Sequence, residues 1–415
     1  MPKFFYIARD NKGNKVSGVE EATSQEEVVN RLQAKDFVIV NVIPEYREDL
    51  RALGSEVLAK AHLRFRHYRV TSDDLVLFCR QLATLLGAGV TILKSLDIIS
   101  VQVSSARLFG IIKNLQKNME AGLSLHEAMA KHSAVFSELW VNLVDSGEAS
   151  GNLAMILSRL ASYLERDASF RRKIISALIY PVILMIAGLG ALLFLTIKII
   201  PTFADLFKTF DLDLPLLTRM LIAISGFIRK YIIIIFIIIA VSFYMFRKYI
   251  RTENGRRRYE RFKFKLPVFG EFFRSLIVER FSSEMSTLVE SGVPILYSLE
   301  ITEHSVGNLV MSDMIRAVKE TVREGKSLSQ PLEKSGFFEP MVVQMIAIGE
   351  EIGELSQMFK KINAFYQEYV EVFLTRFTSM FEPVMIIFMG IIIGMIVIGM
   401  FLPVFQIAQM GGQIK

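Results

Sequence analysis

The sequence predicts an all-α integral membrane protein with two repeated six-helix bundle domains, three transmembrane helices and a small N-terminal α+β unit. Three observations predict this class. Hydrophobic residues make up 52% of the 415 residues, and the mean hydropathy of +0.39 is high for a soluble protein. Three apolar stretches have the length, or the flanking charges, of membrane spans. A pattern in the first half of the chain also recurs in the second half.

Residues 1–44 are predicted to form the α+β unit. The segments FFYIA and KVSGVE flank a DNKGN turn at 10–14, which is typical of a β-hairpin, and FVIVNVI follows as a third strand. Residues 45–70 are polar and basic, and we expect a linker or a tethering helix there. The first residues lack a long apolar core and a small-residue cleavage site. We therefore expect no signal peptide and a cytoplasmic N-terminus.

Transmembrane helices are predicted at 174–199, 231–249 and 381–408. The first and third carry charge only near their ends, at Lys198 and Glu382, and are long enough to cross a hydrocarbon core of roughly 30 Å. The second is shorter, but Arg/Lys pairs bound it on both sides, and their long side chains can reach the interface. Ion and solute pathways usually need polar groups at the membrane midplane. The pattern therefore counts against a transporter.

Charge between the spans predicts the orientation. Residues 247–265 hold nine Lys/Arg against two Glu, whereas residues 200–218 hold three Asp against one Lys. Cytoplasmic loops carry the excess of Lys and Arg. The predicted cytoplasmic parts are the helical domain 71–173 and the basic stretch with the second helical domain, 250–380. The predicted external parts are the loop 200–230 and the tail 409–415.

An internal repeat relates the two halves of the chain. LLGAGVTILKSL at 85–96 matches LVESGVPILYSL at 288–299, which places Gly89 opposite Gly292. Each repeat consists of a helical domain and the span behind it, and the span at 231–249 returns the chain so that both domains lie on one side. A parallel duplication suggests a pseudo-twofold arrangement about the membrane normal. Gly89 and Gly292 are the predicted hinge glycines between the first two helices of each domain.

A Gly–Glu motif recurs at the same position of each repeat, as GEASG and GEEIG. The candidate residues are Gly147, Glu148 and Gly151 in the first repeat, and Gly349, Glu350 and Gly353 in the second. Two interpretations are open. Glycine supplies left-handed backbone, so the motif can be a tight interhelical turn. It can also be a corner that faces a binding partner.

Two further groups concern the membrane. Gly390, Gly394 and Gly399 form a predicted close-packing face on the third span, within or between chains. The basic run includes Arg256, Arg257, Arg258 and Arg261. We expect this run to lie on the membrane surface with anionic lipid headgroups as counterions, although an acidic protein partner could also bind it. We expect no nucleic acid partner.

No set of residues has the spacing of a catalytic or metal site. Gly325-Lys326-Ser327 resembles the end of a phosphate-binding loop, but Glu320 stands where that loop needs glycine. His126 and His132 are six residues apart, which does not suit a helical zinc site. Cys79 is the only cysteine, so an intramolecular disulfide is excluded. We expect no catalytic residue, no metal site and no cofactor, and hence no enzyme.

The combined pattern resembles the platform protein family of type II secretion systems and type IV pili, the GspF/PilC type. The resemblance covers essentially the whole chain. It rests on FFYIARDNKGNKVSGVEEATS, on FCRQLATLLGAGVTILKSL and its echo FSSEMSTLVESGVPILYSL, on GEASGNL and GEEIGEL, and on the terminal FLPVFQIA.

The resemblance implies a concrete function. Members of the family sit in the inner membrane above a hexameric cytoplasmic ATPase, and couple its motions to the extraction and assembly of pilin or pseudopilin subunits into a filament. The implied partners are that ATPase, the pilins or pseudopilins, other inner-membrane assembly proteins, membrane lipid and further copies of the chain. The alternatives are a membrane transporter or channel subunit, and a membrane scaffold unrelated to filaments.

Overall fold

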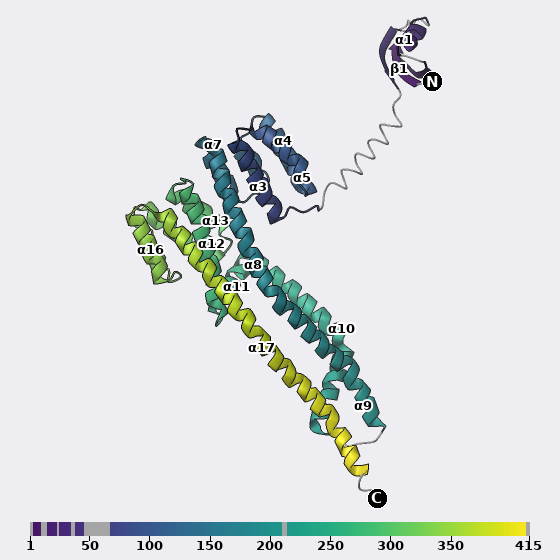
Figure 1. The fold of residues 1–415 in the computed structure, drawn as a ribbon, viewed down its shortest axis with the longest axis vertical. Coiled ribbons are helices and arrows are strands. Elements are labelled where there is room, and N and C mark those ends of the chain that lie inside the picture. The colour runs from purple at the N-terminus through teal and green to yellow at the C-terminus, as the bar shows by residue number, and fades with distance from the viewer. Residues whose placement is uncertain are drawn as a thin grey trace. The chain divides into compact units, whose positions relative to one another are not determined.

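The computed structural model describes residues 3–9, 15–22, 25–34, 38–44, 67–209 and 214–411. The chain divides into two compact units, and Figure 1 shows their elements. Unit 1 comprises Met1–Arg69 with Val103–Leu108, and unit 2 comprises Val70–Gln102 with Phe109–Lys415. The predicted turn at 10–14 and most of the predicted linker lie outside the described residues.

Unit 1 contains the α+β unit that the sequence predicts. The strands are β1 (Lys3–Arg9), β2 (Lys15–Glu21) and β3 (Val38–Pro44), and the helix is α1 (Gln25–Gln33). The sheet order is β2-β1-β3, with both pairs antiparallel. The helix packs on β3 and has fully buried Val28 and Leu32, since one side of a short amphipathic helix must cover the sheet.

Unit 2 contains one helical domain twice. The helices of the first repeat are α3 (Ser72–Gly87), α4 (Ile92–Gln102), α5 (Ala106–Glu120), α6 (Leu125–Ala130), α7 (Glu138–Ala149) and α8 (Leu153–Phe194). Those of the second are α12 (Phe269–Glu290), α13 (Ile295–Ser305), α14 (Leu309–Arg323), α15 (Ser329–Lys334), α16 (Pro340–Glu351) and α17 (Leu355–Gly411), preceded by α11 (Glu253–Lys265). The repeated six-helix bundle domain is therefore confirmed.

The two domains share a core contact as well as a helix order. Phe78 of α3 packs on Phe136, with ring centroids 6.1 Å apart, and the equivalent Phe281 of α12 packs on Phe338 at 5.6 Å. Phe78, Phe136, Phe281 and Phe338 are all buried. Large aromatic rings contribute much of the apolar area that a small domain can bury. The same ring pair therefore anchors the first helix in each repeat.

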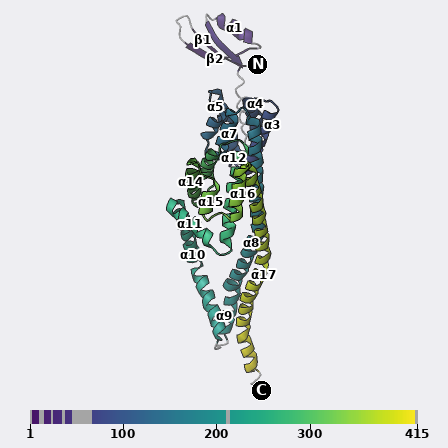
Figure 2. The ribbon, with the colours of Figure 1, turned by 90° about the vertical axis from the view of Figure 1, so that its left-hand side faces the viewer.

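Each domain continues into the membrane stretch through one unbroken helix. α8 runs for 42 residues and α17 for 57, and these two helices lie side by side, as Figures 1 and 2 show. Their contact includes buried Phe170, Val370 and Leu374, and Lys173 pairs with Glu371 at 2.6 Å. Among the described residues, three helical segments are long and apolar enough to cross a membrane: Leu153–Lys208, Leu216–Arg251 and Leu355–Phe405.

The far end of the spans differs from the predicted loop at 200–230. The π-helix η1 (Leu195–Ile199) and α9 (Ile200–Lys208) extend the first span, and α10 (Leu216–Arg251) starts 15 residues before the predicted second span. Hydropathy marked only the most apolar part of α10, although Leu216–Lys230 also suits a helix. The Thr218 hydroxyl donates to the Gly399 carbonyl and the Ser225 hydroxyl to the Thr196 carbonyl. These bonds fix the start of α10 to its neighbours.

A glycine allows α16 to approach α17 closely. A Cβ on Gly349 would lie 2.7 Å from Met358 Cγ and 3.3 Å from Leu355 Cα, both at the start of α17. The equivalent Gly147 lies as close to α8, because a Cβ there would meet Leu153 Cα at 3.1 Å. The Gly of each Gly–Glu motif is thus a position of close approach between two helices, where an added methyl group would push on the neighbouring helix.

We expect Gly349→Ala to destabilise the protein, and Gly110→Ala, in α5, to stabilise it. Alanine favours a helix interior by about 1 kcal/mol over glycine, and nothing lies within 4 Å of a Cβ on Gly110. At Gly349 that gain is outweighed by overpacking, which costs about 1–3 kcal/mol. Thermal unfolding of the full-length protein in detergent measures both. A higher melting temperature for Gly349→Ala would contradict the close approach.

Candidate functional site

The Gly–Glu motif of the first repeat holds the start of a neighbouring helix. Glu148 stands near the end of α7, and its carboxylate accepts the backbone N–H of Leu125 at 2.7 Å and that of His126 at 3.0 Å. The His126 ring nitrogen Nδ1 lies 2.8 Å from the same carboxylate. Leu125 begins α6. A carboxylate at this position satisfies N–H groups that the helix itself leaves free.

The second repeat has the same arrangement. Glu350 accepts the backbone N–H of Leu328 at 2.8 Å and the Ser327 hydroxyl at 2.6 Å, directly before α15. Gly151 and Gly353, which end the two motifs, have φ angles of +69° and +75°, a region that favours glycine. Each motif therefore combines a close helix approach, a helix cap and a left-handed turn. These contacts support the turn interpretation of the motif.

The hinge glycines occupy equivalent turns. Gly89 and Gly292 both have a φ of +81°, and each follows the last turn of the domain's first helix. A Cβ on either would meet nothing within 4 Å. Backbone conformation, and not space, therefore selects glycine at these two positions.

The glycines of the third span have different surroundings. Nothing lies within 4 Å of a Cβ built on Gly390 or Gly394. At Gly399 a Cβ would lie 2.5 Å from Leu221 Cδ1 of α10. Within this chain, close packing of the third span is therefore found at Gly399, beside the Thr218 hydrogen bond.

The basic run on α11 divides into two pairs. Arg256 bonds Glu260 at 2.9 Å and the Gly307 carbonyl at 2.6 Å, and Arg257 pairs with Asp313 at 2.8 Å. Arg258 and Arg261 are exposed, and neither has a hydrogen bond or an ion pair to another described residue. The first pair holds α11 to its domain, and the second pair is available to a partner or a membrane surface.

A buried acidic pair on α12 was missed by the sequence analysis. Glu284 is bonded by Arg280 at 3.0 Å and by the Ser305 hydroxyl at 2.5 Å, and Glu279 accepts Asn363 at 3.0 Å. Burial raises the pKa of both carboxyls above the usual value for glutamate. Their counterparts in the first repeat, Val76 and Gln81, carry no charge. A comparison of the two repeats therefore could not indicate these two glutamates.

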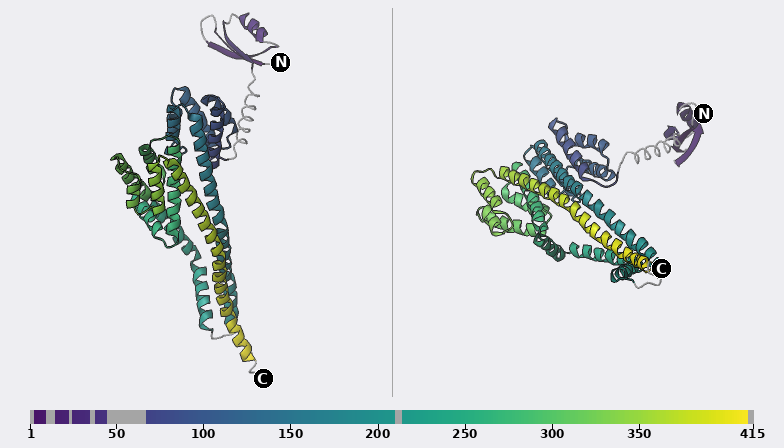
Figure 3. Two further views of the ribbon diagram at one scale, coloured as in Figure 1. Left: turned by 60° about the vertical axis from the view of Figure 1, so that its left-hand side comes forward. Right: turned by 60° about the horizontal axis from the view of Figure 1, so that its bottom comes forward.

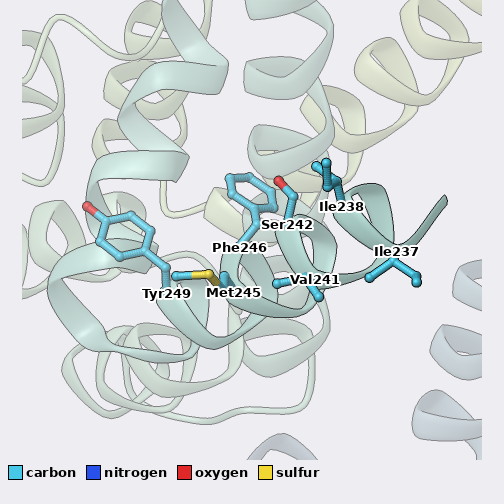
Figure 4. Close-up of a pocket in the computed structure, with 7 residues that line it drawn as sticks. All are labelled: Ile237, Ile238, Val241, Ser242, Met245, Phe246 and Tyr249. Carbon is cyan, nitrogen blue, oxygen red and sulfur yellow. The ribbon is translucent and has the colours of Figure 1, made fainter. Parts of the chain in front are cut away.

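The second span presents an apolar groove. Figures 2 and 3 show α10 separating from α8 and α17 with distance from α9. On that free half lies a groove of about 600 Å³, and all seven residues that line it belong to α10 (Figure 4). They are Ile237, Ile238, Val241, Ser242, Met245, Phe246 and Tyr249. The face is open to lipid or to another apolar helix.

The motifs set aside in the sequence analysis have ordinary surroundings. Lys326 is exposed and pairs with Glu324 at 2.6 Å. Within the described ranges no group of three His, Cys, Asp or Glu residues could hold a metal ion. Cys79 is buried, and burial raises the pKa of its thiol well above the usual value.

Comparison with protein families matches three segments of the chain. The model described as "Type II secretion system (T2SS), protein F" matches residues 78–201 and again 281–403, which correspond to the two repeats. The model described as "Type II secretion system protein F, N-terminal domain" matches residues 1–43.

Curated relatives agree with these matches. The chain is 40% identical to the type IV pilus assembly protein PilC of Thermus thermophilus over 98% of each chain. It is 32% identical to the type II secretion system protein F of Pseudomonas aeruginosa over 99% of this chain and 100% of that one. It is 34% identical to PilC of Myxococcus xanthus over 82% and 81%. The chain therefore belongs to the type II secretion system protein F family.

Proposed function

We propose that this chain is the inner-membrane platform of a type II secretion or type IV pilus machine. In this role it couples a hexameric cytoplasmic ATPase to the extraction and assembly of pilin or pseudopilin subunits. The relatives' names, which are those of pilus assembly and secretion proteins, support the machine. The observation that carries the coupling is that both helical domains lie at the same end of the spans and continue into them through α8 and α17 (Figure 1).

Continuous helices suit the transmission of a movement. A helix that runs from a domain into the bilayer has no joint at the membrane surface, and α8 and α17 support each other there through Phe170, Val370 and Leu374. A displacement imposed on the domains therefore moves the spans. Exposed Arg258 and Arg261 on α11 support a cytoplasmic position for the domains, since basic residues stay on that side.

The open face of α10 suits the second part of the proposed function, which is contact with a subunit that leaves the bilayer. A subunit taken from the bilayer presents an apolar helix, and a groove of apolar side chains can contact it without a polar mismatch. The ATPase then supplies the free energy, and the platform itself needs no catalytic residue and no cofactor.

Binding to the ATPase tests the coupling. Full-length protein in nanodiscs is mixed with the hexameric ATPase of the same organism's machine, with empty nanodiscs as the control. We expect binding that depends on the ATPase nucleotide state, because a stepwise machine must release as well as hold. We expect the isolated chain to hydrolyse no ATP above background. We also expect Lys326→Ala to leave the function of the protein unchanged. ATP hydrolysis that Lys326→Ala abolishes, or no binding in any nucleotide state, would overturn the proposal.

The Gly–Glu motifs are proposed to support the fold and not to contact the ATPase. Removing a carboxylate that satisfies buried N–H groups costs about 1–3 kcal/mol, so Glu350→Ala lowers stability by that amount and Glu350→Gln, which keeps an acceptor, by less. The matched control is Glu351→Ala, since Glu351 is exposed. Denaturant unfolding measures stability, and pilus or secretion output is compared at equal protein levels. Normal stability with lost output would instead identify a partner contact.

A further inference from the structure

The two helical domains contact each other through faces that are not equivalent. α7 of the first repeat packs against α13 of the second, and the Tyr297 hydroxyl donates to Asn142 Oδ1 at 2.5 Å. In the internal repeat, α16 is the counterpart of α7, and α13 is the counterpart of α4. The expected twofold arrangement would also bring α16 against α4, but these helices lie on opposite sides of unit 2 (Figure 1). The contact is thus head to tail, which corrects the pseudo-twofold expectation.

A second contact follows the same direction. α8 of the first repeat packs against α12 of the second, and Arg159 of α8 donates to the Glu290 carbonyl at the end of α12. The first repeat therefore contributes α7 and α8, and the second contributes α12 and α13. Their counterparts remain without a partner domain. They are α16 with the first part of α17 on one side of the two domains, and α3 with α4 on the other (Figure 1).

The unpartnered faces carry polar groups that match those of the internal contact. The counterpart of donor Tyr297 is Lys94, and the counterpart of acceptor Asn142 is Gln344. Lysine can donate to the amide oxygen of glutamine, so the direction of the hydrogen bond is preserved. Lys94 lies 3.8 Å from Asp97 of its own helix, a loose pair that leaves further donors.

The Arg159 contact has a matching pair as well. The counterpart of Arg159 is Lys361, another cation, which is exposed and has no hydrogen bond or ion pair to a described residue. The counterpart of the Glu290 carbonyl is that of Gly87, at the end of α3. A cation near the last carbonyls of a helix is favourable in either place.

Large apolar side chains are exposed on both open faces. Tyr163 of α8 is buried beside Arg280 and Glu284 of α12, but its counterpart Phe365 on α17 is 41% exposed. The exposed set is Leu77 on α3, Leu93 and Val101 on α4, Ile348 on α16, Ile352 directly after α16, and Phe365 on α17. Large apolar side chains that are exposed away from the membrane stretch are typical of an interaction surface.

The membrane permits this contact to be repeated between chains. α8 and α17 run in the same direction from their domains (Figure 1). The operation that carries the first repeat onto the second therefore keeps the spans parallel. If this operation is applied once more, it places a further copy of the chain in the same bilayer and in the same orientation.

We propose that copies of this chain associate head to tail, with the α16–α17 face of one copy against the α3–α4 face of the next. The contact reproduces between chains the one that joins the two repeats within a chain. It rests on the repeats alone and is independent of the proposed coupling to an ATPase.

Cross-linking between two tagged versions of the full-length chain tests the contact. Both carry Cys79→Ala, one carries Lys94→Cys and the other Gln344→Cys, and membranes from cells that express both are treated with a short bis-maleimide. We expect a cross-linked heterodimer. One chain with Asn142→Cys and Tyr297→Cys provides the internal standard, since its two positions touch within the chain. Lys117→Cys on exposed α5 replaces Lys94→Cys as the matched control.

Each outcome decides the proposal. A Lys94→Cys and Gln344→Cys product well above the Lys117→Cys control supports it, and no product above that control overturns it. Preferred products between two copies of the same variant would indicate a twofold contact and would also overturn it. Adding Ile348→Glu to the Gln344→Cys copy should lower the yield about tenfold, since an unpaired carboxylate is costly to bury. Phe262→Glu in the same copy, on an exposed residue of α11 outside both faces and outside the internal contact, should leave it unchanged.

Discussion

The packing of α8 against α17 is the contact on which the rest of unit 2 depends. Each helix belongs to one helical domain at one end and to the membrane stretch at the other, so one contact joins both domains to both spans. Burial of Phe170, Val370 and Leu374, with Phe272 of α12 beside them, makes the junction apolar where the helices leave the domains. The Lys173–Glu371 pair is exposed and adds little stability, but it fixes the register of the two helices.

The second span is held differently from the other two, and the difference suits the proposed function. α10 is tied near its start by the hydroxyls of Thr218 and Ser225 and by contact with Gly399, while its other half turns an apolar face away from α8 and α17. Unit 2 thus combines two helices that support each other, α8 and α17, with a span, α10, that is fixed at one end. In the proposed function, α8 and α17 transmit a displacement of the domains, and the free half of α10 contacts an apolar helix.

Much of this was accessible from the sequence, because its patterns are local. The repeat, the three spans and the turn glycines Gly89 and Gly292 follow from spacing and hydropathy. The partners of Glu148 and Glu350 were not predictable, since each caps a helix that starts more than 20 residues earlier in the chain. The head-to-tail contact was also missed. Duplication establishes that two domains are alike, but only their packing decides which faces meet.

The central claim is that the helical domains and the spans move as one body through α8 and α17. Single-molecule energy transfer between dyes at Lys334→Cys on α15 and Lys208→Cys on α9, in a Cys79→Ala chain in nanodiscs, tests it most directly. A control chain carries flexible Gly-Ser insertions after the equivalent residues Ile174 and Arg376. The account predicts one narrow distance distribution for the uninterrupted chain and a broad one for the control. A distribution as broad as that of the control would contradict it.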